Sequence, residues 1–132
     1  MTDGAAGERR KPAPRTGLRH GLAAAGYSFA GFRRLLEEPA FRQEIGAGLV
    51  VLALFAAVGA PVWTYAAQAV LFLVLMAVEA LNTAVEVLVD RISPDYAEFA
   101  RHAKDLGSFA VFCLLAANAI LAGAVLWTAW RG

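Results

Sequence analysis

Long stretches without charge are the feature that most constrains the fold of this chain of 132 residues. Residues 45–63 carry no charged side chain, and at about 1.5 Å per residue they can cross a hydrocarbon layer of about 30 Å. Two more apolar stretches lie at about 65–89 and 106–130. Because 59% of the residues are apolar, which is more than in ordinary soluble domains, we predict an all-α integral membrane protein with three transmembrane helices.

The charged residues are distributed unevenly along the chain. Eight of the twelve Lys and Arg residues precede residue 45, which predicts a cytoplasmic amino terminus and, after three spans, an external carboxyl terminus. Residues 1–16 are basic and poor in apolar side chains, so they are predicted to be a disordered tail ahead of one membrane domain at 17–132. The net charge of +1 gives no indication of nucleic-acid binding.

Residues 17–37 show the periodicity of an amphipathic helix. Apolar side chains recur there at alternating spacings of four and three: Leu18, Leu22, Ala25, Phe29, Phe32 and Leu36. Arg19, Arg33 and Arg34 lie off this stripe. Such a helix lies in the membrane surface, with its apolar side among the acyl chains and its arginines among the headgroups.

Two connections between the spans are predicted. An uncharged turn at residues 59–62 joins the first span to the second. Ser93 followed by Pro94 is typical of a helix start, with serine as the N-cap and proline in the first position. The charged stretch from there to Asp105 is predicted to be a water-facing connection. By the positive-inside rule, it lies on the same membrane side as the basic amino-terminal region.

One polar stripe runs along the second span. At 100° per residue, about a third of the helix circumference holds all of its members, which are Glu79, Asn82, Thr83, Glu86 and Asp90. A carboxylate in the membrane centre costs roughly 2.5 to 3.5 kcal/mol, whereas a hydrogen bond between membrane helices contributes only about 0.6 kcal/mol on average. Helix association alone therefore does not explain two glutamates within this span, and the stripe is predicted to be functional.

Grouped carboxylates near a polar surface suit Mg²⁺, which is usually held by one or two carboxylates together with substrate phosphates and water. Glu38, on the same membrane side, is expected to complete such a site with Glu86. The glycine-rich phosphate loop GxxxxGK[ST] is absent, which excludes a soluble nucleotide-binding fold of that type. Phosphates would instead be met by the metal and by the cations Lys104, Arg19 and Arg42.

Four short motifs together resemble the prokaryotic diacylglycerol kinase family. They are Ala25-Gly26-Tyr27-Ser28, Ala40-Phe41-Arg42-Gln43-Glu44, the E-A-L-N-T-A-V-E block from Glu79 to Glu86 continued by Val89-Asp90-Arg91-Ile92, and Ala103-Lys104-Asp105-Leu106-Gly107-Ser108. The similarity covers about residues 17–130. It implies a homotrimer in the bacterial cytoplasmic (inner) membrane that uses ATP and Mg²⁺ to phosphorylate the lipid diacylglycerol to phosphatidic acid.

The resemblance also implies a role for individual residues. Glu79 matches the general base, and Glu38 and Glu86 match the metal-binding carboxylates. The residues implied to contact ATP are Arg19, Tyr27, Glu38, Glu86, Asp95, Lys104 and Asp105. The residues implied to contact the lipid are Ser28, Arg42, Gln43, Glu79, Asn82 and Ser108. Glu44 and Asp90 match further polar residues of the same site.

Two alternative functions remain open at this point. An undecaprenol kinase shares the fold and the motifs, but Phe41-Arg42-Gln43-Glu44 is similar to the Gram-negative diacylglycerol kinases. The stripe of Glu79, Asn82 and Glu86 also suits a proton or cation conductor. Lys104 and Asp105, gathered with Glu38 on the cytoplasmic side, favour the kinase.

Overall fold

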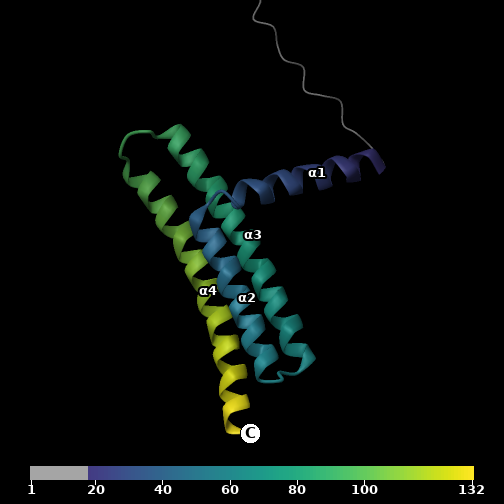
Figure 1. The fold of residues 1–132 in the computed structure, drawn as a ribbon. Helices are drawn as coiled ribbons and strands as arrows, with labels where there is room; N and C mark the ends of the chain where they lie inside the picture. Colours follow the sequence, from purple (N-terminus) through teal and green to yellow (C-terminus); the bar gives the residue numbers. More distant parts are fainter. Residues whose placement is uncertain (1–17) are drawn as a thin grey trace, which may run out of the picture.

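The computed structural model describes residues 18–132, and side chains from Gly21 onward, so the predicted tail at 1–16 lies outside the described residues. The helices are α1 (Leu18–Leu35), α2 (Pro39–Ala57), α3 (Val62–Ile92) and α4 (Glu98–Arg131). In Figure 1, α2, α3 and α4 form an up-and-down bundle and α1 projects sideways from one end of it. Three of the helices are long and apolar enough to cross a membrane. The predicted helical membrane fold is therefore confirmed.

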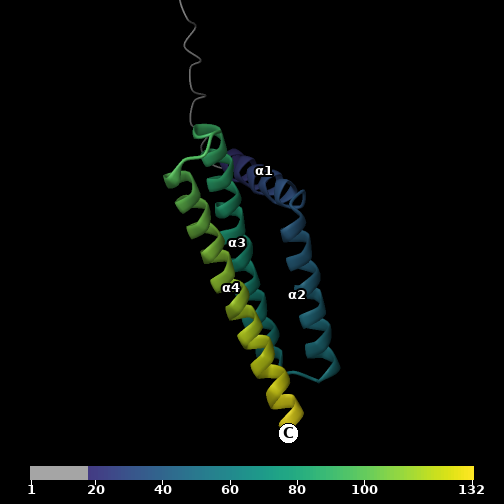
Figure 2. The same cartoon turned by 90° about the vertical axis from the view of Figure 1, so that its left-hand side faces the viewer.

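The bundle has two ends that differ in character. The polar end carries α1 and the connection 93–97, whereas the far end carries the turn 58–61 and the carboxyl terminus (Figure 1). With 31 residues, α3 is roughly 46 Å long and exceeds the hydrocarbon thickness. Most contacts between helices join α3 to α4, and Figure 2 shows α2 standing to one side of that pair.

The helix boundaries differ from the predicted spans. The first apolar helix occupies Pro39–Ala57 instead of 45–63, because Pro39 opens it at the first position and the chain turns at Gly59, whose φ is +64°. Trp63 therefore belongs to α3. The stretch 98–105, which was predicted to be a connection, is instead the helical start of α4, the helix predicted to begin at residue 106.

The predicted helix start at Ser93 and Pro94 is wrong. The helix α4 begins at Glu98, and its N-cap residue is Ala97. Ser93 Oγ instead donates a hydrogen bond to the carbonyl oxygen of Asp95 at 3.0 Å, within the connection. Because proline disfavours helical backbone in the residue before it, Ser93 and Pro94 end α3 and form a turn.

A compact apolar cluster holds the far end together. It is built on Phe55, Ala122 and Val125, with Val51, Ala60, Tyr65 and Leu121 packed around them. The rings of Phe55 and Tyr65 meet edge to face with centroids 5.7 Å apart. Thr64 Oγ1 donates to the carbonyl oxygen of Pro61 at 2.7 Å, which satisfies a buried hydroxyl beside the turn.

The corner between α1 and α2 is fixed by one aromatic pair and one arginine. Phe32 and Phe41 meet edge to face at 6.0 Å, and Phe41 is fully buried. Arg42 Nη1 donates to the carbonyl oxygens of Leu36 and Glu37 at 3.1 and 3.3 Å. These contacts set the angle at which α1 leaves the bundle, while most of its apolar side chains remain exposed, as in a surface helix.

Candidate active site

The carboxylate pocket is a cavity of about 320 Å³ between the start of α2 and the polar halves of α3 and α4. Its polar lining consists of Glu38, Glu44, Glu79, Asn82, Thr83, Glu86 and Ser108. Its remaining lining consists of Pro39, Ala40, Val111 and Leu115. The structure thus brings six of the sequence-predicted site residues together from three helices.

Glu79 is the most deeply buried of these carboxylates. Its residue is only 7% exposed, and among the described residues no donor lies within hydrogen-bond distance of its Oε2 atom. Burying an unpaired carboxylate oxygen is costly, so such an atom in a cavity is expected to meet a ligand or water. Glu79 is therefore held ready to accept a hydrogen bond inside the pocket.

Asn82 orients Glu86, one turn further along α3. Asn82 Nδ2 donates to Glu86 Oε1 at 3.0 Å, while Asn82 Oδ1 is buried without a partner among the described residues. On α4, Gly107 lies directly against this amide, and a Cβ atom at position 107 would overlap Asn82 Oδ1. Gly107 belongs to the fourth family motif, and a glycine inside a long helix is the sequence signal that could have indicated this close approach.

Glu38 enters the pocket from the corner of the chain. It is the N-cap residue of α2, but its side chain makes no capping hydrogen bond. Glu38 Oε1 instead pairs with Arg34 Nη1 at 2.8 Å, and the same nitrogen lies 3.3 Å from Glu37 Oε2. Because both partners are substantially exposed, this ion pair is weak and can be exchanged for another partner.

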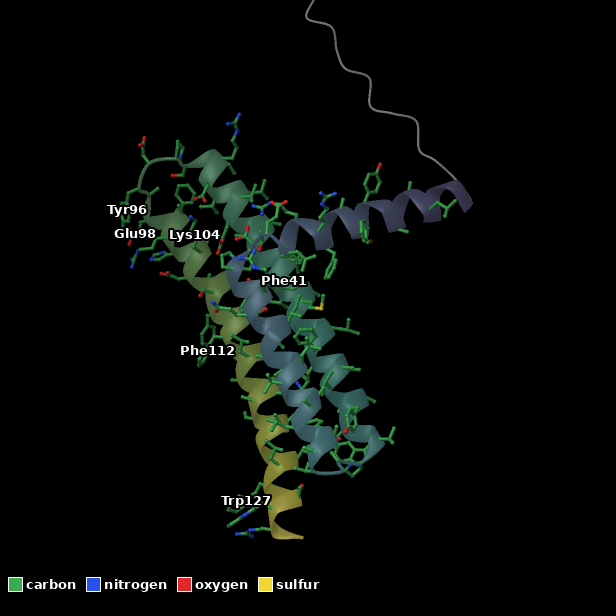
Figure 3. The ribbon with its side chains drawn as sticks, viewed as in Figure 1. Phe41, Tyr96, Glu98, Lys104, Phe112 and Trp127 are labelled. Carbon is green, nitrogen blue, oxygen red and sulfur yellow. The ribbon has the colours of Figure 1, made fainter. Side chains whose placement is uncertain are left out.

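A second cavity, the loop pocket, has a volume of about 330 Å³ and lies one helical turn beyond the carboxylate pocket. The predicted residues that line it are Asp90, Asp95, Lys104 and Asp105. Lys104 Nζ pairs with Asp90 Oδ1 at 2.5 Å and thereby joins α4 to α3. Figure 3 shows Lys104 and Tyr96 at this end of the bundle and Trp127 at the other.

Other predicted residues line neither pocket. Tyr27 is 74% exposed on α1, and Ser28 Oγ donates to the carbonyl oxygen of Ala24 within the same helix at 3.1 Å. Gln43 is exposed on α2, and Arg42 is engaged at the corner. Arg19 belongs to the first turn of α1, and its side chain lies outside the described residues.

The carboxylate pocket fits a magnesium ion that arrives with phosphates. Within the described part of the chain, no group of three or more His, Cys, Asp or Glu side chains is arranged to hold a metal. Mg²⁺ does not need such a group, since it usually takes one or two protein carboxylates and completes its shell with phosphate and water. Glu38, Glu79 and Glu86 line one cavity whose lining residues include no Lys or Arg. Among the described residues only Glu38 of these three has an ion-pair partner, Arg34, so a bound cation would balance the charge that remains.

The sequence of this chain is similar to a known family and to several relatives. The family model described as prokaryotic diacylglycerol kinase matches residues 26–126. A diacylglycerol kinase of Sinorhizobium sp is 50% identical over 111 residues, which cover 84% of this chain and 81% of the relative. The diacylglycerol kinase of Escherichia coli K12 is 40% identical over 116 residues, covering 86% and 93%. That of Pseudomonas aeruginosa is 37% identical over 101 residues, covering 76% and 82%.

Proposed function

The chain belongs to the prokaryotic diacylglycerol kinase family, and we propose that it transfers the γ-phosphoryl group of MgATP to the hydroxyl group of diacylglycerol, giving phosphatidic acid and ADP. The observation that carries this proposal is the pair of adjoining pockets at the polar end. The carboxylate pocket combines carboxylates with apolar lining. The loop pocket lies one helical turn away and contains the ion pair of Lys104 with Asp90. A lipid and a nucleotide can therefore meet there.

Glu79 and Glu86 have different roles at different depths along α3 in this proposal. Glu79 precedes Glu86 by seven residues, so the two lie about 10 Å apart along the axis, which leaves room for a phosphoryl group and a hydroxyl. Glu79 accepts the proton of the lipid hydroxyl group while the lipid hydroxyl oxygen attacks the γ-phosphorus. The bond from the γ-phosphorus to the bridging oxygen breaks in the same step, and ADP leaves.

Glu86 and Glu38 are the residues that hold the metal in this proposal. Mg²⁺ supplies charge neutralisation for the phosphates when it is bound. Asn82 keeps Glu86 in place through the 3.0 Å hydrogen bond, and the family resemblance implies that it also contacts the lipid. Asp95, Lys104 and Asp105 contact the nucleotide from the loop pocket. Ser108 contacts the lipid headgroup in this proposal, and Glu44 is a further polar residue of the same carboxylate pocket.

We also propose that the enzyme works as a homotrimer. Tyr27 and Ser28 lie on exposed parts of α1, away from both pockets of their own chain. If these residues and Arg19 contact substrates, as the family resemblance implies, they contact them on a neighbouring copy. Gln43 is exposed on α2 and is therefore also free to contact such a neighbour.

The apolar helices make this a membrane protein, and we propose that it lies in the bacterial cytoplasmic membrane with the polar end facing the cytoplasm. The basic residues before α2 support this orientation by the positive-inside rule. A reporter enzyme that is active only outside the cytoplasm, fused after Gly132, should be active. A reporter that is active only in the cytoplasm, fused at the same place, should be inactive, and the reverse pattern would overturn the orientation.

The decisive experiment supplies the purified protein with MgATP and one lipid alcohol at a time, and follows phosphate transfer to the lipid. Phosphatidic acid is expected from diacylglycerol, with little product from undecaprenol. Preferential phosphorylation of undecaprenol would show that the protein is an undecaprenol kinase of the same fold. ATP hydrolysis that requires added lipid would exclude a passive conductor, and no transfer to either lipid would overturn the proposed function.

A further inference from the structure

A polar pair inside the bundle has no part in the proposed chemistry. Gln68 Nε2 on α3 donates to Asn118 Oδ1 on α4 at 2.6 Å. Asn118 Nδ2 donates in turn to the carbonyl oxygen of Leu114 at 2.8 Å, which sets the direction of both amides. Gln68 is only 3% exposed, and its Oε1 atom is buried without a partner among the described residues. An unpaired amide oxygen so deep in a membrane helix requires an explanation.

The pair lies at the bottom of a cleft between α2, α3 and α4, with a volume of about 240 Å³. Glu44 lines one end of this interhelical cleft, and Gln68 and Asn118 line the other. The walls between them are mainly apolar and include Phe72 and Leu75. The cleft therefore has apolar sides and a polar floor.

The interhelical cleft continues directly from the carboxylate pocket. Glu44 and Leu115 line both cavities. Beyond the floor, the far-end cluster closes the space, since Val51 lines the cleft and packs against Phe55, which is fully buried. Gln68 precedes Glu79 by eleven residues of α3, so the floor lies about 16 Å from the proposed catalytic carboxylate.

We propose that the interhelical cleft holds an acyl chain of the lipid substrate and that the Gln68–Asn118 pair limits the length of chain that fits. This inference rests on the proposed function, because it requires the glycerol hydroxyl at Glu79. A chain that ends above the floor contacts mainly the apolar walls. A longer chain presses methylene groups against the amides of Gln68 and Asn118, and this is unfavourable because it leaves polar groups facing hydrocarbon without a partner.

The test is the dependence of kcat/KM on acyl length. Diacylglycerols with two identical chains of increasing length are presented to the full-length protein in one fixed bilayer, and kcat/KM is measured for each. Wild type should discriminate against chains beyond a threshold length. Gln68→Leu and Asn118→Leu make the floor apolar, so the ratio of kcat/KM for long over short chains should rise about tenfold or more, the scale of discrimination of a methylene in an apolar pocket.

A variant that changes the ratio of kcat/KM for long over short chains in the opposite direction distinguishes an effect on the cleft from general damage to the fold. Ala119 lines the cleft beside Asn118, so Ala119→Phe fills the lower part and should lower the same ratio. Gln68→Met keeps the side-chain length and should act like Gln68→Leu if the leucine variant does not fold. Val70→Leu, on a 60% exposed position of α3 outside the cleft, is the matched control and should leave the ratio unchanged.

The possible results distinguish a failure of the acyl-chain role of the cleft from a failure of the proposed kinase function. A general loss of folding lowers kcat/KM for all chain lengths alike, whereas loss of the floor changes only their ratio. If wild type phosphorylates diacylglycerol but the ratio is the same in every folded variant, the inference is wrong and the function stands. If wild type phosphorylates no diacylglycerol, the proposed function is wrong and the inference falls with it.

Discussion

The two ends of the bundle treat their buried polar atoms differently. At the far end, the buried hydroxyl of Thr64 donates to the carbonyl oxygen of Pro61 at 2.7 Å, and the more exposed hydroxyl of Thr128 donates to that of Val125 at 2.8 Å. At the polar end, oxygen atoms of Glu44, Glu79 and Asn82 are buried without a partner among the described residues. Native proteins leave few such atoms unpaired, and those that remain are often ligand sites. The far end stabilises the fold, and the polar end keeps polar groups available for substrates.

The largest effect on turnover is expected from Glu86→Gln at the polar end. The variant should lose about 10³-fold or more in lipid phosphorylation, because the metal contributes several kcal/mol of charge stabilisation that depends on this carboxylate. MgATP binding, measured by titration calorimetry, should weaken strongly. Glu98→Gln is the matched control, since Glu98 is exposed and lines neither pocket. Wild-type affinity for MgATP in a folded Glu86→Gln protein would refute the metal assignment.

Glu79→Gln is expected to have the next largest effect. The amide keeps the shape of the side chain but cannot accept the hydroxyl proton, so turnover should fall by about 10²-fold or more, a range typical for a lost general base. Unlike Glu86→Gln, this variant should keep wild-type affinity for MgATP and the same oligomeric state by light scattering. Normal turnover in the folded variant would show that Glu79 only joins helices.

Gly107→Ala tests the contact of α4 with Asn82, and the expected loss of turnover is smaller than for Glu86→Gln or Glu79→Gln. The added Cβ atom overlaps Asn82 Oδ1, so Asn82 must move and its hydrogen bond to Glu86 is disturbed. Turnover is expected to fall about tenfold, as when an outer partner of a metal ligand is lost. Gly123→Ala provides the control, because nothing lies within 4 Å of a Cβ atom there. Equal effects of the two substitutions would mean that loss of glycine, and not the contact with Asn82, is responsible.

Phe55→Ala at the far end should have the smallest effect on turnover. It opens a cavity beside Tyr65 and Val125, and the free energy of unfolding should fall by roughly 3 kcal/mol. Turnover per folded molecule should remain within about twofold of wild type, since Phe55 lines neither pocket of the polar end. Thermal unfolding followed by circular dichroism in one detergent measures the first quantity. A large loss of turnover with unchanged unfolding would contradict the division between the two ends.

Local sequence was sufficient for the features that belong to one helix at a time. The length and apolar character of the three stretches predicted helices, because only a helix satisfies its own backbone hydrogen bonds in lipid within one segment. The stripe of Glu79, Asn82 and Glu86 followed from helical periodicity alone, and these three residues do line one pocket. Helix ends were less predictable, as the turn at Ser93 and Pro94 shows.

Tertiary structure decided which residues from different helices meet. The approach of Gly107 to Asn82 and the bridge from Gln68 to Asn118 join positions on different helices, and no local pattern encodes either contact. Periodicity reports which side of its own helix a residue occupies, but the helix that faces this side depends on how all of the helices pack together. For the same physical reason, Tyr27 and Ser28 belong to one of the family motifs and yet line neither pocket of their own chain.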